Sequence, residues 1–287
     1  MSGIAMILMV SFNKILYNGH NKSLEMVMYM GKFLIASSWN RLDEYKQIAE
    51  KYSLGFEWND FYQPDLLDSK EKLTMVEEDY RRKGLPAYNT MHGAFYDVTV
   101  FSSDSAIRRI SIMRMEQSME IAKRMGAKAV VFHTNVNPFL TDTGYINEAV
   151  EQTVAVLKRL LSQYPQIHIY MENMFEQNPL VLGKMSEQLG QVPNYGVCFD
   201  YAHASVSTTA VEEWLEQLNP YIKHVHVNDN DGKRDLHLAV GDGVTDWNLF
   251  CMYYHKYFEN CSLLIETADP VSQEKSVEFL RKIKIYE

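Results

Sequence analysis

Residues 195–203 read Tyr-Gly-Val-Cys-Phe-Asp-Tyr-Ala-His, and this stretch shows the pattern that decides the fold. An apolar run of strand-forming residues ends at a carboxylate, Asp200, and a segment with helical character follows it. The run has no alternation of polar and apolar residues, which is typical of strands in a parallel sheet that is covered on both faces. The stretch therefore predicts a buried parallel strand with an ionisable side chain at its carboxyl end.

The same pattern recurs along the chain from Lys32 to the C-terminus. The runs are Phe33–Ser37, Leu54–Trp58, Ala87–His92, Lys128–His133, Ile167–Glu172, Tyr195–Asp200, Ile222–His226 and Leu263–Glu266. Most gaps between them hold one crossover helix, because a strand–helix–strand unit needs about 30 residues. One of these helices has clear end signals, since Asp104 is a candidate N-cap and Gly126 lies where a C-terminal glycine is expected.

These units predict an α/β fold of the (β/α)8 TIM-barrel type. From Lys32 onward the chain has about 250 residues, which is the usual length of such a barrel. A doubly wound open sheet is the competing architecture, but it would need a glycine-rich phosphate turn after an early strand. The only GxG sequence, at 241–243, comes late and lacks a third glycine. We predict one catalytic TIM-barrel domain over residues 32–287, preceded by a loosely ordered, Met-rich extension over residues 1–31.

The composition is that of an ordinary globular protein, with 46% hydrophobic and 23% charged residues. A net charge of −9 argues against nucleic acid as the main partner, because phosphate backbones are bound by basic surfaces. Three cysteines without a CxxC pair indicate neither a disulfide framework nor a thiolate zinc site. The apolar stretch at 4–12 is too short for a membrane span and lacks a signal-peptide pattern. We expect a cytoplasmic protein without membrane attachment, and the sequence leaves open whether it forms a homo-oligomer.

Ionisable side chains close, or nearly close, most of the predicted strands. They are His92, His133, Glu172, Asp200, His226 and Glu266. In a TIM barrel the carboxyl ends of the strands meet at one mouth, where barrel enzymes build their active sites. A buried carboxylate is costly unless it is paired or bound to a metal, so this set predicts cations at the mouth. Imidazole nitrogen and carboxylate oxygen without sulfur suit Zn²⁺, Mn²⁺, Co²⁺ or Fe²⁺ better than Ca²⁺.

Further candidates lie in the loops that follow these strands. His203 comes three residues after Asp200, and Asp235 and His237 flank Leu236, so that in an extended chain both would point the same way. A lone histidine at such a place is more often a core or surface residue, and we interpret His224 in that way. The whole group, which contains five of the nine histidines, favours a metal site.

Three other residues are weaker candidates for substrate binding. Trp39 and Trp58 follow or end the first two predicted strands and could stack on a sugar, although ordinary aromatic packing is an equal alternative. Arg234 could bind a substrate phosphate or carboxylate, and a solvated loop charge is as good an interpretation.

Several short motifs follow one another in the chain. They are His92-Gly93-Ala94-Phe95, Val131-Phe132-His133, Met171-Glu172-Asn173, the residues 197–204, the residues 226–229, Asp235-Leu236-His237 and the residues 264–267. Together they resemble the xylose isomerase-like barrel superfamily, which contains sugar phosphate isomerases/epimerases and the endonuclease IV type of abasic-site nuclease. The segment after His133, residues 134–139, departs from the His-Pro-Gly that is usual in both branches.

The resemblance implies a metal site and roles for its residues. Glu172, Asp200, His226 and Glu266 match the single-metal site of the ketose epimerases, with Glu172 and Glu266 as the proton-transfer pair and His203 in contact with substrate. In the nuclease branch, His92 and His133 with Glu172 would hold a second ion, and His203, Asp235 and His237 would hold a third.

We therefore expect a metal-dependent isomerase or epimerase of carbohydrate metabolism, acting on a small sugar or sugar phosphate with Mn²⁺, Zn²⁺ or Co²⁺. One ion is expected, and the residues allow up to three. The alternative is an endonuclease IV-like zinc phosphodiesterase acting on abasic-site DNA, which the net charge disfavours. An acidic loop predicted over residues 60–83 disfavours it as well. A dehydratase on the same scaffold would begin with the same proton abstraction, and a barrel that only binds a sugar would leave both glutamates unused.

Overall fold

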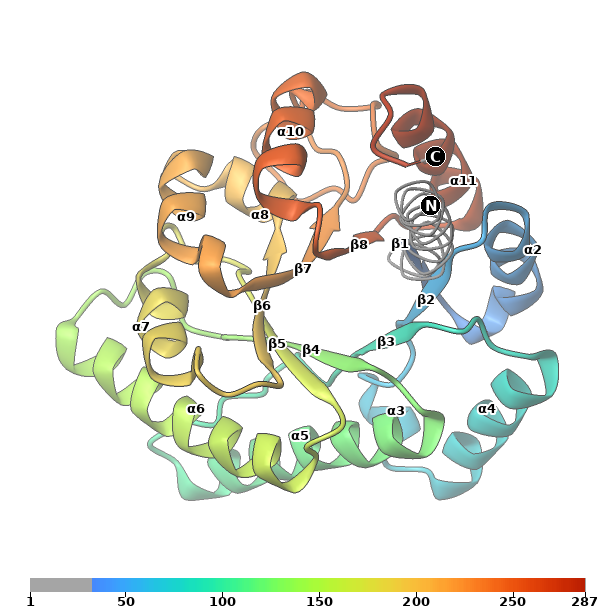
Figure 1. Cartoon of the computed structure of the whole chain (residues 1–287). Coiled ribbons are helices and arrows are strands. Elements are labelled where there is room, and N and C mark those ends of the chain that lie inside the picture. Colours follow the sequence, from blue (N-terminus) through green and yellow to red (C-terminus); the bar gives the residue numbers. More distant parts are fainter. Residues whose placement is uncertain (1–32, 287) are drawn as a thin grey trace, which may run out of the picture.

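A computed structural model describes residues 33–286, and the predicted extension over residues 1–31 lies outside the described residues. Parallel strands pair in chain order from β1 to β8, and β8 pairs again with β1, so the sheet closes into a barrel. The helices surround this barrel as an outer ring (Figure 1). The predicted TIM barrel is therefore confirmed.

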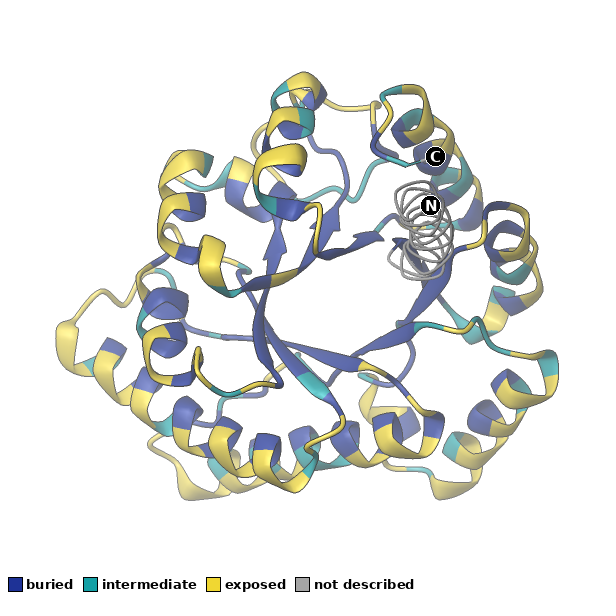
Figure 2. Cartoon of the chain, in the orientation of Figure 1, coloured by how far each residue is buried: buried dark blue, intermediate teal, exposed yellow. Residues whose placement is uncertain are grey.

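Each strand coincides with a predicted apolar run to within two residues at either end. The strands are β1 (Phe33–Ser37), β2 (Gly55–Trp58), β3 (Asn89–His92), β4 (Ala129–His133), β5 (His168–Glu172), β6 (Tyr195–Asp200), β7 (Ile222–Val227) and β8 (Ser262–Ile265). They are buried along almost their whole length (Figure 2). Inward side chains of such a barrel fill its interior, and outward ones pack beneath the helices. This two-sided burial explains why the runs show no polar alternation.

The connections between the strands are mainly helical. The helices are α2 (Leu42–Tyr52), α3 (Pro64–Leu67), α4 (Lys70–Lys83), α5 (Ser105–Met125), α6 (Thr143–Gln163), α7 (Leu180–Leu189), α8 (Tyr201–Val206), α9 (Val211–Leu218), α10 (Trp247–Tyr253) and α11 (Pro270–Lys282). The end signals of α5 are confirmed: Asp104 accepts hydrogen bonds from the amides of Ala106 and Ile107, and Gly126 has the left-handed φ of 76°. No helix within residues 33–286 is long and apolar enough to cross a membrane.

The prediction of an acidic loop over residues 60–83 is wrong, because α3 and α4 occupy most of it. Ser69 caps α4 by accepting a hydrogen bond from the amide of Lys72. The helix buries only a narrow face, Val76, Glu77 and Tyr80, and that sparse apolar pattern hid it in the sequence. Glu77 also pairs with Arg124 at 2.5 Å, so the acidic charge of this segment is partly neutralised.

Strand register brings polar strand ends together at the carboxyl mouth of the barrel. His133 at the end of β4 is the partner of Glu172 at the end of β5. Asp200 at the end of β6 is the partner of His226 in β7. Glu266 directly follows β8, and its amide donates to the carbonyl of Val227. Barrel closure therefore concentrates ionisable side chains from separate parts of the sequence in one small volume.

Candidate metal centre

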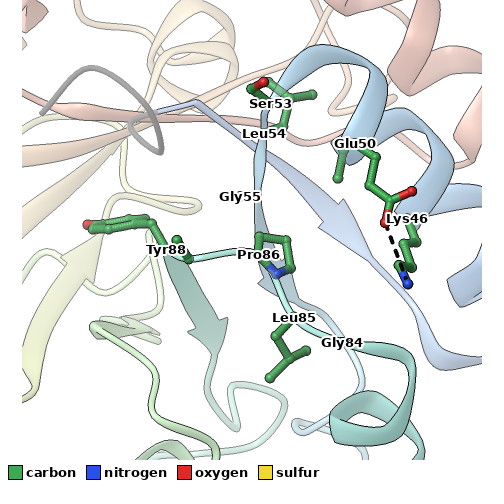
Figure 3. Close-up of a pocket in the computed structure, with 11 residues that line it drawn as sticks. Lys46, Glu50, Ser53, Leu54, Gly55, Gly84, Leu85, Pro86 and Tyr88 are labelled. Carbon is green, nitrogen blue, oxygen red and sulfur yellow. Dashed lines mark ion pairs between the residues drawn. The ribbon is translucent and has the colours of Figure 1, made fainter. Parts of the chain in front are cut away.

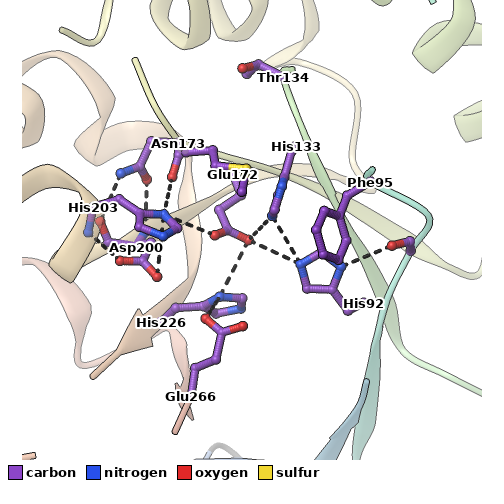
Figure 4. A network of polar contacts seen from close by, with 12 residues as sticks. His92, Phe95, His133, Thr134, Glu172, Asn173, Asp200, His203, His226 and Glu266 are labelled. Carbon is purple, nitrogen blue, oxygen red and sulfur yellow. Dashed lines mark hydrogen bonds and ion pairs between the residues drawn. The ribbon is translucent and has the colours of Figure 1, made fainter. Parts of the chain in front are cut away.

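Four side chains, three from β5, β6 and β7 and one directly after β8, meet at the mouth: Glu172, Asp200, His226 and Glu266, which we call the main cluster. One ligand atom from each lies within 4.8 Å of the other three. Glu172, Asp200 and His226 are almost completely buried, and the side chain of Glu266 is 12% exposed. His226 Nδ1 lies 3.1 Å from Glu266 Oε2 and 3.5 Å from Glu172 Oε2 (Figure 4). The structure thus brings together the four residues that the sequence analysis placed around one ion.

The first flanking group consists of His92, His133 and the shared Glu172. His133 Nε2 lies 3.3 Å from Glu172 Oε2, and the two imidazoles face each other with their Nε2 atoms 3.1 Å apart. The aromatic rings of Phe95 and Tyr62 cover this group, with 4.7 Å between the ring centroids of Phe95 and each histidine. The unusual segment after His133 therefore leaves its side chain at the mouth.

The second flanking group consists of His203, Asp235 and His237. Asp235 Oδ2 lies 3.2 Å from His203 Nε2 and 2.9 Å from His237 Nε2. The geometry at His237 differs from the extended chain that we expected, because its φ is 47°. The left-handed turn, rather than strand-like alternation, brings the Asp235 and His237 side chains together.

Asp229 fixes the loop that carries Asp235 and His237. The backbone of this buried residue forms an isolated antiparallel bridge with Leu238, and its two carboxylate oxygens accept four hydrogen bonds. The donors are the amides of Asn230, Gly241 and Thr245 and the indole Nε1 of Trp247. Such a saturated carboxylate holds the loop from both ends and so presents the second flanking group to the mouth.

Backbone carbonyls set the direction in which three imidazoles face. The Nδ1 atom of each ring donates to a backbone carbonyl over 2.8–3.0 Å. His92 donates to Gly93, His203 donates to Asn173, and His237 donates to Glu266. A carbonyl can only accept, so in the neutral ring the proton lies on Nδ1 and the Nε2 lone pair faces the cluster. Metal-binding histidines in proteins are oriented in the same way.

The residues present fit a divalent cation. Glu172 Oε2, Asp200 Oδ2 and His226 Nδ1 are buried and have no hydrogen bond, although a buried polar atom without a partner is costly. Asp200 divides its oxygens between two tasks, since Oδ1 accepts from the amide of His203 at 2.7 Å and caps α8. A set of carboxylate oxygens and imidazole nitrogens is typical of Zn²⁺, Mn²⁺ and Co²⁺ sites.

Proton affinities at the mouth are strongly perturbed. Burial raises the pKa of Asp200 to about 7 and that of Glu172 above its ordinary value. Burial also lowers the pKa of His133 to about 3, and nearby His203 adds to that shift. Although burial opposes it, the hydrogen bond to Asp235 raises the pKa of His237 to about 10. Such divergent shifts within one cluster of side chains are typical of functional sites.

The residues that we considered for substrate binding lie in different surroundings. The indole of Trp58 is fully buried and packs against Phe61 and Tyr80, so it belongs to the core and has no surface to offer a sugar. Trp39 is partly exposed, and its Nε1 donates to Asp79 at 2.8 Å. Arg234 is exposed, with both Nε and a terminal nitrogen on Asp231.

Two polar residues near the main cluster were not anticipated as site residues. Asn173 bonds through its amide group to both the backbone N–H and the carbonyl of Asp200, each at 2.8 Å. Glu57 lies within β2, completely buried and close to His226. The sequence signal for Glu57 was a single carboxylate in the middle of an otherwise apolar strand.

A separate cavity of about 370 Å³ lies at the opposite end of the barrel, between α2 and the segment that precedes β3 (Figure 3). Its lining includes Lys46, Glu50, Leu54 and Tyr88. Lys46 and Glu50 pair with each other at 3.5 Å, and the lining gathers no set of metal-ligating side chains. Barrel enzymes act at the carboxyl ends of their strands, so the mouth with the main cluster is the candidate functional site.

A family model described as xylose isomerase-like TIM barrel matches residues 48–283. Among curated proteins, the uncharacterized protein MJ1311 of Methanocaldococcus jannaschii is 28% identical over 163 residues. That alignment covers 53% of this chain and 55% of the relative, so the match spans about half the length of each protein.

Solved structures share the fold over most of this chain. The TTHB071 protein from Thermus thermophilus, soaked with ZnCl2, has a TM-score of 0.71 at 24% identity and covers 88% of this chain and 98% of its own. A D-tagatose 3-epimerase-like protein has a TM-score of 0.70 at 22% identity, covering 88% and 97%. Endonuclease IV from Thermus thermophilus has a TM-score of 0.61 at 15% identity, covering 87% and 97%. The neighbours therefore include proteins of both branches.

Proposed function

The chain belongs to the xylose isomerase-like TIM barrel family, and from this premise we propose that it is a divalent-metal-dependent isomerase or epimerase of a small sugar. The observation that carries the proposal is the main cluster, in which Glu172 and Glu266 reach the same small volume from β5 and from the end of β8. An ion bound there would stabilise the negative charge that develops on a carbonyl oxygen when the neighbouring carbon loses a proton.

In this proposal the two glutamates move the proton. Glu172 Oε2 and Glu266 Oε2 each lie within 3.5 Å of His226 Nδ1, so both carboxylates reach the space in front of that nitrogen. One carboxylate takes the proton from carbon, and the other, which starts in its protonated form, delivers a proton. Delivery to the opposite face of the same carbon inverts the stereocentre, and delivery to the neighbouring carbon moves the carbonyl group. Asp200 and His226 complete the ligand set.

His203 is assigned the role of orienting a substrate oxygen. Its Nδ1 is anchored on the carbonyl of Asn173 and lies 3.5 Å from Glu172 Oε1, so the ring is held beside the proton-transfer pair. The rings of Tyr62 and Phe95 next to His92 offer an apolar wall for the C–H face of a sugar.

One observation favours a second candidate, an endonuclease IV-like zinc phosphodiesterase acting on abasic-site DNA. Within each flanking group, one ligand atom from every residue lies within 4.8 Å of the other two, and two such groups beside the main cluster would suit a site with three ions. The net charge of −9 still disfavours a DNA ligand. A dehydratase would use the same first proton abstraction as the isomerase.

The test incubates purified protein with a panel of ketoses in deuterated water, in the presence of Mn²⁺, Co²⁺ or Zn²⁺, beside abasic-site DNA. Deuterium in a recovered or epimerised sugar supports the proposal, and Glu266→Gln should abolish the incorporation. Arg159→Gln, an exposed change on α6 whose partner is Glu116, is the matched control and should keep it. Cleavage of the DNA without deuterium incorporation would overturn the proposal in favour of the nuclease.

A further inference from the structure

Glu57 is a buried carboxylate that the proposed mechanism does not use. It lies in β2 inside the barrel, and its backbone pairs with β1 and β3. The residue has no exposed surface. A carboxylate in such a position is expensive unless other groups compensate its charge, so its surroundings call for an explanation.

Three side chains surround the Glu57 carboxylate. Thr90 Oγ1 donates to Oε2 at 2.6 Å, and His224 Nε2 lies 3.2 Å from the same oxygen. His226 Nε2 lies 3.3 Å from Oε1. His224 is itself held by Ser262, whose Oγ lies 2.7 Å from its Nδ1. Side chains of β2, β3, β7 and β8 thus form one polar layer directly beneath the main cluster.

His226 faces this layer with one nitrogen and the main cluster with the other. Its Nδ1 is the atom close to Glu172 and Glu266, whereas its Nε2 is close to Glu57. An ionised carboxylate can only accept, so Glu57 stabilises a proton on Nε2. A cation in the main cluster would then take the Nδ1 lone pair, on the side where Glu172 and Glu266 lie. Backbone carbonyl oxygens have the corresponding role for His92, His203 and His237, where they hold the proton on Nδ1 and leave Nε2 free to bind.

We propose that Glu57 is a positioning residue of the metal centre, which fixes the tautomer and ring orientation of His226 and makes its Nδ1 a stronger ligand. The inference rests on the proposed metal centre and is independent of which reaction the centre performs. Partners of this kind typically change metal affinity about 10–100-fold when they are removed. A carboxylate that served stability alone would leave that affinity unchanged.

The first experiment measures Zn²⁺ or Mn²⁺ affinity by competition with a chelator in wild-type protein and in Glu57→Gln. We expect binding to weaken about 10–100-fold. The matched control is Glu77→Gln, because Glu77 is also a buried carboxylate but pairs with Arg81 and Arg124 in the helical ring. The control should lose stability and keep its metal affinity. Equal affinities of wild type and Glu57→Gln would overturn the inference.

A second measurement uses wild-type protein and can be made even if Glu57→Gln does not fold. Long-range ¹H–¹⁵N spectra of histidine-labelled wild type with Zn²⁺ bound report which nitrogen of His226 is the ligand and which carries the proton, and we expect Nδ1 as the ligand and the proton on Nε2. A proton on Nδ1 would overturn the inference. Thr90→Val removes the hydroxyl that holds Glu57 and should weaken metal binding by a smaller factor. If wild type itself binds no metal, the metal centre fails as well, whereas equal binding by the variants overturns only the role of Glu57.

Discussion

Replacing Asp229 by Asn tests how the loop of the second flanking group is held. One oxygen of Asp229 accepts from the amides of Asn230 and Thr245, and the other accepts from the amide of Gly241 and the indole of Trp247. An amide side chain has only one oxygen, so two of these donors would face an NH2 group. Each buried donor left without an acceptor costs about 1–3 kcal/mol, which gives about 2–6 kcal/mol for the pair.

Urea unfolding followed by tryptophan fluorescence measures this loss for Asp229→Asn. The same variant should lower the affinity of the second flanking group for metal, since Asp235 and His237 depend on the loop. Asp246→Asn is the control, because Asp246 caps α10 from an exposed position and Asn caps helices about as well as Asp, so this variant should lose little stability. A loss below about 1 kcal/mol for Asp229→Asn would refute the reasoning, because then the four bonds would not be holding the loop.

Other expectations follow from the same structure. Removing bound metal with a chelator should lower the melting temperature of wild type, because Glu172 Oε2 and Asp200 Oδ2 stay buried without a hydrogen bond. An unchanged melting temperature would contradict the proposed centre. In metal-free protein the pKa of His237 is raised to about 10 by its hydrogen bond to Asp235. This pairing therefore contributes fully to the stability of the folded protein below about pH 6.5, and the contribution is lost as the pH rises through 10. His237→Gln should remove that part of the slope when stability is measured against pH. Trp58→Ala should cost about 3–5 kcal/mol in urea unfolding, as a core residue does, and unaltered stability would show that the ring is not packed as described.

Local sequence predicted the barrel well because each strand carries its own signal. An apolar run such as residues 195–200 needs no distant information to be recognised, and the ionisable residue at its end marks the mouth. Helix α4 was missed because its buried face is only three residues wide and one of them is Glu77. Charge dominated its composition, and the periodic signal that identifies a helix was too weak.

Glu57 and Asp229 could not be assigned from sequence for a different reason. The partners of Glu57 lie on β3 and β7, and β7 meets β2 only across the closed interior of the barrel. The partners of Asp229 come from a loop whose path no periodicity describes. Residues that act through other residues depend on closure and loop packing, whereas residues at strand ends are visible from their position alone.

The donor set itself does not separate a sugar epimerase from a nuclease, because Glu172 belongs to both the main cluster and the first flanking group. An ion in the main cluster would share Glu172 with any ion beside His92 and His133, so occupation of the two is coupled. The two reactions are therefore distinguished by the number of metal ions that the mouth binds tightly. If metal titration in wild type ends at one tightly held ion, with the flanking groups empty, the mouth is equipped for proton transfer. Three tightly held ions would instead favour phosphodiester chemistry.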